Sequence, residues 1–166
     1  MTACAVQIGK WACKQAISDA VAPTHFLPMK TPFSQHLLAQ QFPASCPCQD
    51  PNTVQHLCTF CTERGYRLGL IINLAAHACL YAADLPAGVP MQQVPMAAKV
   101  IPPEEQVQAA LSLADALWAR DPEAYIAVHC DYGAELFLWL LCTLTPSMQW
   151  LVHVYTPHWH SCPALQ

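Results

Sequence analysis

Short runs of apolar residues alternate with amphipathic segments along this chain, and together they predict an α/β fold. The run from Leu68 to Leu74 is continuous and of strand length, and a second such run covers Tyr125 to His129. Uninterrupted apolar runs of this length are typical of strands buried on both faces of a parallel sheet. A weaker strand is predicted at 91–96. Strands alternating with helices predict a central, mostly parallel sheet flanked by helices.

Two helices are predicted from their end signals and their apolar stripes. Asn52 or Thr53 can cap a short helix, and Gly65 ends it. Two prolines followed by two glutamates at 102–105 open a second helix, which stops at Asp121-Pro122. The expected buried stripes are Val54, Leu57, Cys58 and Cys61 on the first helix, and Val107, Ala110, Leu111, Ala114, Leu117 and Trp118 on the second.

The segments before these elements have weaker patterns. Residues 1–22 are small and apolar, with Trp11 and Ile17 as the sizeable anchors, and they predict a loosely structured lead-in. Two prolines in 25–32 exclude a regular helix and favour an extended segment. Three prolines and two cysteines in 43–51 predict a loop.

The end of the chain differs from the rest. Its last 33 residues contain one charged residue, Glu135, and no Lys or Arg. The uncharged span 136–155 reaches the roughly 20 residues that cross a bilayer. Its proline, glutamine and histidine weigh against a membrane anchor, which stays the less favoured interpretation. We therefore expect one domain at 23–145, followed by an atypical tail at 146–166.

Composition narrows the class of protein. The chain has 166 residues, of which 54% are hydrophobic and 11% charged, with a net charge of -4. This length suits one domain with its own core, and the hydrophobic content argues against a disordered chain. Seven Lys plus Arg are too few to hold long nucleic acid by charge, so any RNA contact would be local.

The cysteines indicate a reducing compartment. Ten cysteines make up about 6% of the chain, below the roughly 8–10% of a short disulfide scaffold. Lys10 and Lys14 interrupt the apolar N-terminal residues, so no secretory signal is readable. We expect reduced thiols and a nuclear or cytoplasmic location.

The candidate chemistry lies where the second predicted strand ends. Ligands of open α/β sheets bind beyond the carboxyl ends of the strands, and this strand runs directly into Cys130. A strand that delivers a His-Cys pair into a turn before a helix is how cysteine-dependent phosphatases build their site. Amide N–H groups of the turn and the positive helix end lower the thiol's pKa and bind phosphate oxygens. Taken alone, the pair is a weak signal, and a structural core cysteine is the favoured interpretation.

Five segments along the chain strengthen the interpretation of this His-Cys pair as a catalytic site. They are Phe26–Pro32, Leu68–Leu74 with Asn73 where an acid is usual, Tyr81–Pro86, Ala98–Pro102 and Ile126–Gly133. Together they resemble the RNA 5′-triphosphatases of the cysteine-phosphatase superfamily, which include the N-terminal domain of the animal mRNA capping enzyme and the related dual-specificity phosphatase that trims RNA 5′ ends. The resemblance covers about residues 24–133 and implies a cysteine-phosphatase-like fold.

The resemblance implies that Cys130 attacks phosphorus to form a cysteinyl-phosphate, which water then hydrolyses. His129 would orient the thiol and help to ionise it. The implied substrate is a 5′-triphosphate or 5′-diphosphate RNA end, with a phosphoprotein as the other class, and no cofactor is implied. The segment 96–103 contains no aspartate to act as general acid, which a diphosphate leaving group tolerates. The implied phosphate-binding residues are Asp131, Tyr132, Gly133, Ala134, Glu135, Leu136 and Lys99.

The chain departs from the family after Gly133. The family signature has an arginine six residues after the cysteine, where this chain has Leu136. A guanidinium clamps two phosphate oxygens and neutralises charge in the transition state, and leucine does neither. We therefore expect an impaired phosphatase or, as the alternative, a pseudophosphatase that binds phosphorylated RNA ends or a protein partner.

Two explanations of this departure stay open. The chain is either a decayed family member, or its sequence after Gly133 derives from an aberrant transcript or gene model, and the abrupt loss of matches favours the second. On either account the family's C-terminal helices are missing. The sheet would then be incompletely covered, which predicts low stability.

Other possible ligand sets are weaker. Cys46, Cys48, Cys58 and Cys61 could bind zinc tetrahedrally. Cys58 and Cys61, however, already belong to the apolar stripe of a predicted helix, where free cysteine behaves as a small hydrophobe. We expect no metal site. The scattered histidines, among them His77, are expected to have surface or packing roles.

Overall fold

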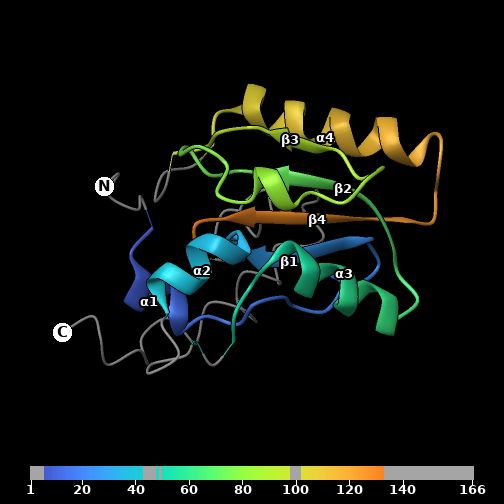
Figure 1. Ribbon diagram of the computed structural model, residues 1–166. Helices are drawn as coiled ribbons and strands as arrows, with labels where there is room; N and C mark the ends of the chain where they lie inside the picture. Colours follow the sequence, from blue (N-terminus) through green and yellow to red (C-terminus); the bar gives the residue numbers. More distant parts are fainter. Residues whose placement is uncertain (1–5, 43–47, 49, 98–101, 133–166) are drawn as a thin grey trace.

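The chain forms an α/β domain around a four-stranded sheet. The computed structural model describes residues 6–42, 48, 50–97 and 102–132. The strands are β1 (Phe26–Lys30), β2 (Arg67–Asn73), β3 (Met91–Gln93) and β4 (Ala124–Cys130), in the order β1-β4-β2-β3 and all parallel. The expected mostly parallel central sheet is confirmed (Figure 1).

Helices cover both faces of the sheet. Figure 1 shows α4 (Glu104–Trp118) on one face and α3 (Val54–Glu63) on the other. Two short helices, α1 (Ile8–Ala12) and α2 (Gln35–Gln41), and the 3-10 turn η1 (Ala82–Asp84) complete the described elements. An apolar cluster lies between the sheet and each of the two main helices. This layering explains why the runs at 68–74 and 125–129 are apolar on both sides.

The end signals of the two main helices act as predicted. The Thr53 side chain accepts a hydrogen bond from the backbone N–H of His56 at 3.0 Å, which caps α3. Gly65, with φ of 68°, follows the end of that helix. The second helix begins after Pro103 with two glutamates in its first turn. Its buried residues are Val107, Ala110, Ala114 and Leu117, all from the predicted stripe.

The expectation of a loosely structured lead-in is wrong for residues 6–22. Trp11 in α1 is fully buried, and its Nε1 donates to the carbonyl oxygen of Thr31 at 2.8 Å. Ile17 is buried as well and forms an isolated antiparallel bridge with Met29 of β1. These contacts are made with residues distant in sequence, so the local pattern of small residues did not indicate them.

Gly69 lies where β2 approaches both its neighbour strand and α4. The register of β2 against β4 shifts between Leu68 and Leu70. A Cβ at Gly69 would lie 2.9 Å from the Cβ of Ala124 and 2.9 Å from Cδ2 of Leu117. The first of these atoms is fixed by the β4 backbone, so a methyl group cannot be accommodated by a side-chain rotation alone.

We expect Gly69→Ala to lower the free energy of unfolding by about 1–3 kcal/mol, because it overpacks this contact. Urea denaturation followed by circular dichroism measures the change. Gly9→Ala is the matched control, since a Cβ at Gly9 meets nothing within 4 Å. Equal stabilities of the two variants would contradict the prediction.

Several predictions concern residues outside the described part of the chain. Among the described residues, no helix is long and apolar enough to cross a membrane. The uncharged span 136–155 and the atypical tail 146–166 lie outside them, as does most of the predicted loop at 43–51.

Candidate functional site

The carboxyl ends of the strands meet at one edge of the sheet, and Cys130 lies at its centre. All four strands are parallel, and β4 lies between β1 and β2. Cys130 is paired with Lys30 of β1, and the preceding residue, His129, is paired with Asn73 of β2. The predicted position of Cys130 at the carboxyl end of a buried strand is therefore confirmed, at the edge where α/β proteins bind ligands.

The Cys130 side chain is 6% exposed and belongs to the apolar cluster between the sheet and α4. The turn residues that the resemblance places around a phosphate, Gly133, Ala134, Glu135 and Leu136, lie outside the described residues, and so does Lys99. Of the expected site, the structure thus describes the nucleophile, its histidine neighbour and the first two residues of the turn.

The His129 imidazole is fully buried beside Tyr81. Its Nε2 lies 2.6 Å from the Tyr81 hydroxyl, and its Nδ1 lies 3.3 Å from the carbonyl oxygen of Cys130. Burial lowers the pKa of His129 to about 3, so the ring is neutral at physiological pH. The carbonyl accepts from Nδ1–H, and Nε2 accepts from the Tyr81 hydroxyl.

This bonding changes the role expected of His129. Side chains alternate along a strand, so the Cys130 thiol lies on the α4 face, whereas Tyr81 packs in the cluster on the α3 face. The imidazole is directed to Tyr81 and to the Cys130 peptide carbonyl. Any effect of His129 on the nucleophile through these bonds therefore acts on the backbone of Cys130.

Tyr81 belongs to a segment that carries the family resemblance, but no role was predicted for it. Its side chain is fully buried, and burial raises the pKa of its hydroxyl, with a further rise from the neighbouring Cys79. A buried tyrosine hydroxyl generally has a hydrogen-bond partner, and His129 is one here. The sequence signal that could have indicated this hydrogen bond is the position of Tyr81 in the segment Tyr81–Pro86, which carries part of the resemblance.

We expect Tyr81→Phe to lower the free energy of unfolding by about 1–3 kcal/mol, because it leaves Nε2 of His129 buried without a donor. Urea denaturation measures the loss. Tyr66→Phe serves as control, since Tyr66 is half-buried and its ring stacks on Tyr125 with centroids 4.0 Å apart. A loss in Tyr81→Phe no larger than in this control would contradict the prediction.

Asp131, the residue after Cys130, contacts His77, a histidine that belongs to no sequence motif. Nε2 of His77 lies 3.1 Å from Oδ1 of Asp131, and the Asp131 carbonyl accepts from the backbone N–H of Thr31 at 3.4 Å. Asp131 thus contacts segments that follow both flanking strands, β1 and β2. No sequence signal indicated this pairing, because the two side chains belong to loops far apart in the chain.

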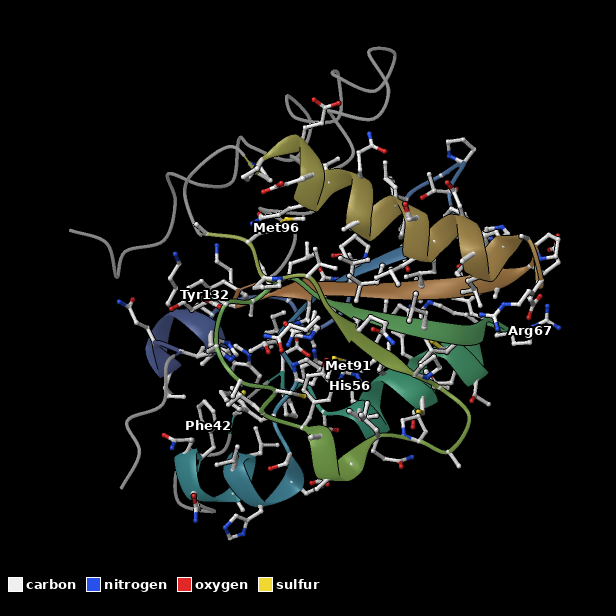
Figure 2. The ribbon with its side chains drawn as sticks, turned by 90° about the horizontal axis from the view of Figure 1, so that it is seen from above. Phe42, His56, Arg67, Met91, Met96 and Tyr132 are labelled. Atoms are coloured by element: carbon white, nitrogen blue, oxygen red, sulfur yellow. The ribbon has the colours of Figure 1, made fainter. Side chains whose placement is uncertain are left out.

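Tyr132 packs against the N-terminal segment. Its hydroxyl accepts from the backbone N–H of Gln7 at 3.0 Å, and the Lys10 ammonium lies 4.3 Å from its ring centroid. Figure 2 shows Tyr132 beside α1, at the opposite end of the sheet from Arg67. The side chain of this predicted phosphate-binding residue therefore contributes to packing, and its backbone remains the group that could contact a phosphate.

Unpaired polar atoms concentrate at the carboxyl edge. The described residues include four buried side-chain atoms with neither a hydrogen-bond nor an ion-pair partner, and three of them belong to segments at this edge. Buried polar atoms are normally satisfied, so such a concentration favours a place where water or a polar ligand binds. The three atoms are Thr31 Oγ1, Asn52 Oδ1 and Asn73 Nδ2.

The cysteines considered for zinc do not form a ligand cluster in the described part of the chain. No group of three or more His, Cys, Asp or Glu residues there could hold a metal ion. Cys61 is buried on the apolar face of α3, and burial raises the pKa of its thiol to about 11. Such a thiol is protonated and is a poor metal ligand. Cys46 lies outside the described residues.

Comparison with known proteins leaves the chain unassigned. No protein-family model matches it, and no curated protein sequence matches it. The resemblance to RNA 5′-triphosphatases accordingly depends on the five segments between residues 24 and 133.

Proposed function

We propose that this domain is a cysteine-dependent phosphatase of the RNA 5′-triphosphatase type, with low turnover, acting on RNA ends in the nucleus or cytoplasm. The observation that carries the proposal is the position of Cys130 at the carboxyl end of β4, between the ends of two other parallel strands. This is the edge at which α/β proteins bind ligands.

The reaction proceeds in two steps. The Cys130 thiolate attacks the terminal phosphorus of a 5′-triphosphate, so that an S–P bond forms and the bond to the bridging oxygen breaks. The RNA leaves with a 5′-diphosphate that carries the electron pair of the broken bond. Water then attacks the cysteinyl-phosphate, which releases inorganic phosphate and restores the thiol.

Two features support an RNA end, one against a long nucleic acid and one against a phosphoprotein. The net charge of -4 argues against binding along a phosphate backbone by charge. The absence of an aspartate from the segment 96–103 is tolerable for a good leaving group such as a diphosphate, which needs less protonation than a serine or tyrosine oxygen.

The low turnover follows from Leu136. Removing one preorganised donor from a transition state costs about 2.7–4 kcal/mol, on the order of a hundredfold to a thousandfold in rate. The arginine that the resemblance expects at position 136 would also supply a positive charge, which Leu136 lacks. The same observation favours a second function, a pseudophosphatase that binds phosphorylated RNA ends without hydrolysis.

Phosphate release from RNA labelled at the γ-phosphate tests the proposal. We expect slow release by the parent chain, loss of release in Cys130→Ser, and unchanged release in the control Cys13→Ser, whose thiol is exposed. Saturable binding of 5′-triphosphate RNA over 5′-hydroxyl RNA, without release, assigns the second function. If the chain shows no phosphate release and no selective binding, both functions are contradicted. If it releases phosphate from a phosphotyrosine peptide alone, the substrate is a phosphoprotein and not RNA.

A further inference from the structure

A contact between His77 and Asp131 joins two loops at the carboxyl edge of the sheet. His77 lies between β2 and η1, and Asp131 directly follows Cys130. Nε2 of His77 lies 3.1 Å from Oδ1 of Asp131, and the side chains are 12% and 27% exposed. The first residue of the turn after the proposed nucleophile is thus connected to a second strand-end loop.

The geometry requires a protonated imidazole. Nδ1 of His77 lies 2.7 Å from the carbonyl oxygen of Ala78, and a carbonyl only accepts, so Nδ1 carries a proton. In the neutral ring, Nε2 would present its lone pair to the Asp131 carboxylate at 3.1 Å, which is repulsive. The contact with the carboxylate therefore needs the charged ring, in which Nε2 carries a proton.

The groups around the imidazole favour its charged form. The Asp131 carboxylate raises the pKa of His77 above its ordinary value of 6.5, against the opposite effect of burial. His129 on β4 is neutral, so it places no full charge beside the ring at physiological pH. From β3, Gln93 donates its side-chain N–H to the His77 carbonyl at 2.8 Å, which holds the loop but adds no charge.

We propose that His77 is a positioning residue, which holds the turn after Cys130 through Asp131 and does so only while its imidazole is protonated. The consequence for catalysis rests on the proposed phosphatase function: the ion pair fixes the peptide next to the nucleophile and offsets an acidic charge that would repel a phosphate. The contact itself does not depend on that function.

The direction of the pH dependence follows from the raised pKa. The folded state binds the His77 proton more tightly than the unfolded chain does. The contribution is therefore complete below about pH 6.5 and is lost as the pH rises through the higher value in the folded protein.

Proton NMR of the histidine ring tests the ion pair. We expect the His77 midpoint to lie above 6.5 in the parent chain and to fall by about one pH unit in Asp131→Asn, as expected when an opposite charge is removed at this distance. The ring signal of His36 in α2, an exposed residue, serves as the internal reference in both proteins. A His77 midpoint at or below 6.5, unchanged by Asp131→Asn, would overturn the proposal.

Hydrogen exchange tests the positioning. Corrected for intrinsic rates, protection of residues 129–132 relative to β2 should fall about tenfold between pH 6 and pH 8.5 in the parent chain. His77→Asn should show the lower protection at both pH values, whereas the control His36→Asn should behave like the parent. Protection independent of pH and of His77 would overturn the positioning role. Neither measurement uses RNA, so failure here is distinct from failure of the phosphatase proposal.

Discussion

Leu136→Arg is expected to raise the rate of phosphate release from 5′-triphosphate RNA by about a hundredfold or more. Position 136 is six residues beyond Cys130, where the resemblance places the arginine that clamps phosphate oxygens. A guanidinium there would restore donors and a positive charge that act in the transition state, and one such donor alone is worth about 2.7–4 kcal/mol. Turnover under substrate saturation measures the gain, because the effect belongs to kcat.

Three companion variants separate this mechanism from others. Leu136→Lys should gain less, since an ammonium supplies charge without the planar fork of the guanidinium. Leu136→Met should equal the parent chain. Addition of Cys130→Ser to Leu136→Arg should abolish release, because the nucleophile is then missing. If Leu136→Arg releases phosphate no faster than Leu136→Met, the assignment of the turn after Cys130 to phosphate binding is wrong.

The elements with strong local patterns were predictable because burial determined their composition. The strands at 68–74 and 125–129 are apolar on both sides since α3 and α4 cover both faces of the sheet. The main helices carry their own end signals, such as the Thr53 cap. The strand order β1-β4-β2-β3 could not be predicted, because the pairing of distant segments does not affect the local pattern of apolar and polar residues.

Structure that depends on distant partners was missed for the same reason. Trp11 was recognised as an anchor, but its burial and its bond to the Thr31 carbonyl depend on β1, so the lead-in was wrongly predicted to be loose. The candidate site shows the same division. The position of Cys130 follows from strand polarity, whereas the side-chain partners of His129 and Asp131, Tyr81 and His77, come from the segment after β2.

The largest loss of stability is expected at Lys30, whose ammonium joins three segments at the end of β1. The side chain is fully buried, and Nζ donates to the carbonyl oxygens of Trp11, Lys14 and Asp50 at 3.2, 2.8 and 2.6 Å. It also lies 3.9 Å from the centroid of the Trp11 ring. Desolvation lowers the pKa of Lys30, opposed by the nearby Cys48, Asp50 and Cys13, so burial of this charge is tolerated only because of its partners.

We expect Lys30→Met to lower the free energy of unfolding by about 3 kcal/mol or more. Methionine fills much of the same volume but leaves the carbonyls of Lys14 and Asp50 without this donor, and each unsatisfied buried group costs about 1–3 kcal/mol. The Trp11 carbonyl loses less, since it also accepts from the backbone N–H of Lys14. Urea denaturation measures the total effect.

Trypsin cleavage after Lys10 gives a local readout of the same substitution, because loss of the ammonium frees the segment that contains α1. We expect faster cleavage there in Lys30→Met than in the parent chain. Lys14→Met is the matched control: it makes the same chemical change at a half-exposed side chain whose carbonyl stays in place, so its stability should remain within about 0.5 kcal/mol of the parent. Equal stability and equal cleavage in the two variants would mean that Lys30 does not hold the N-terminal segment to the sheet.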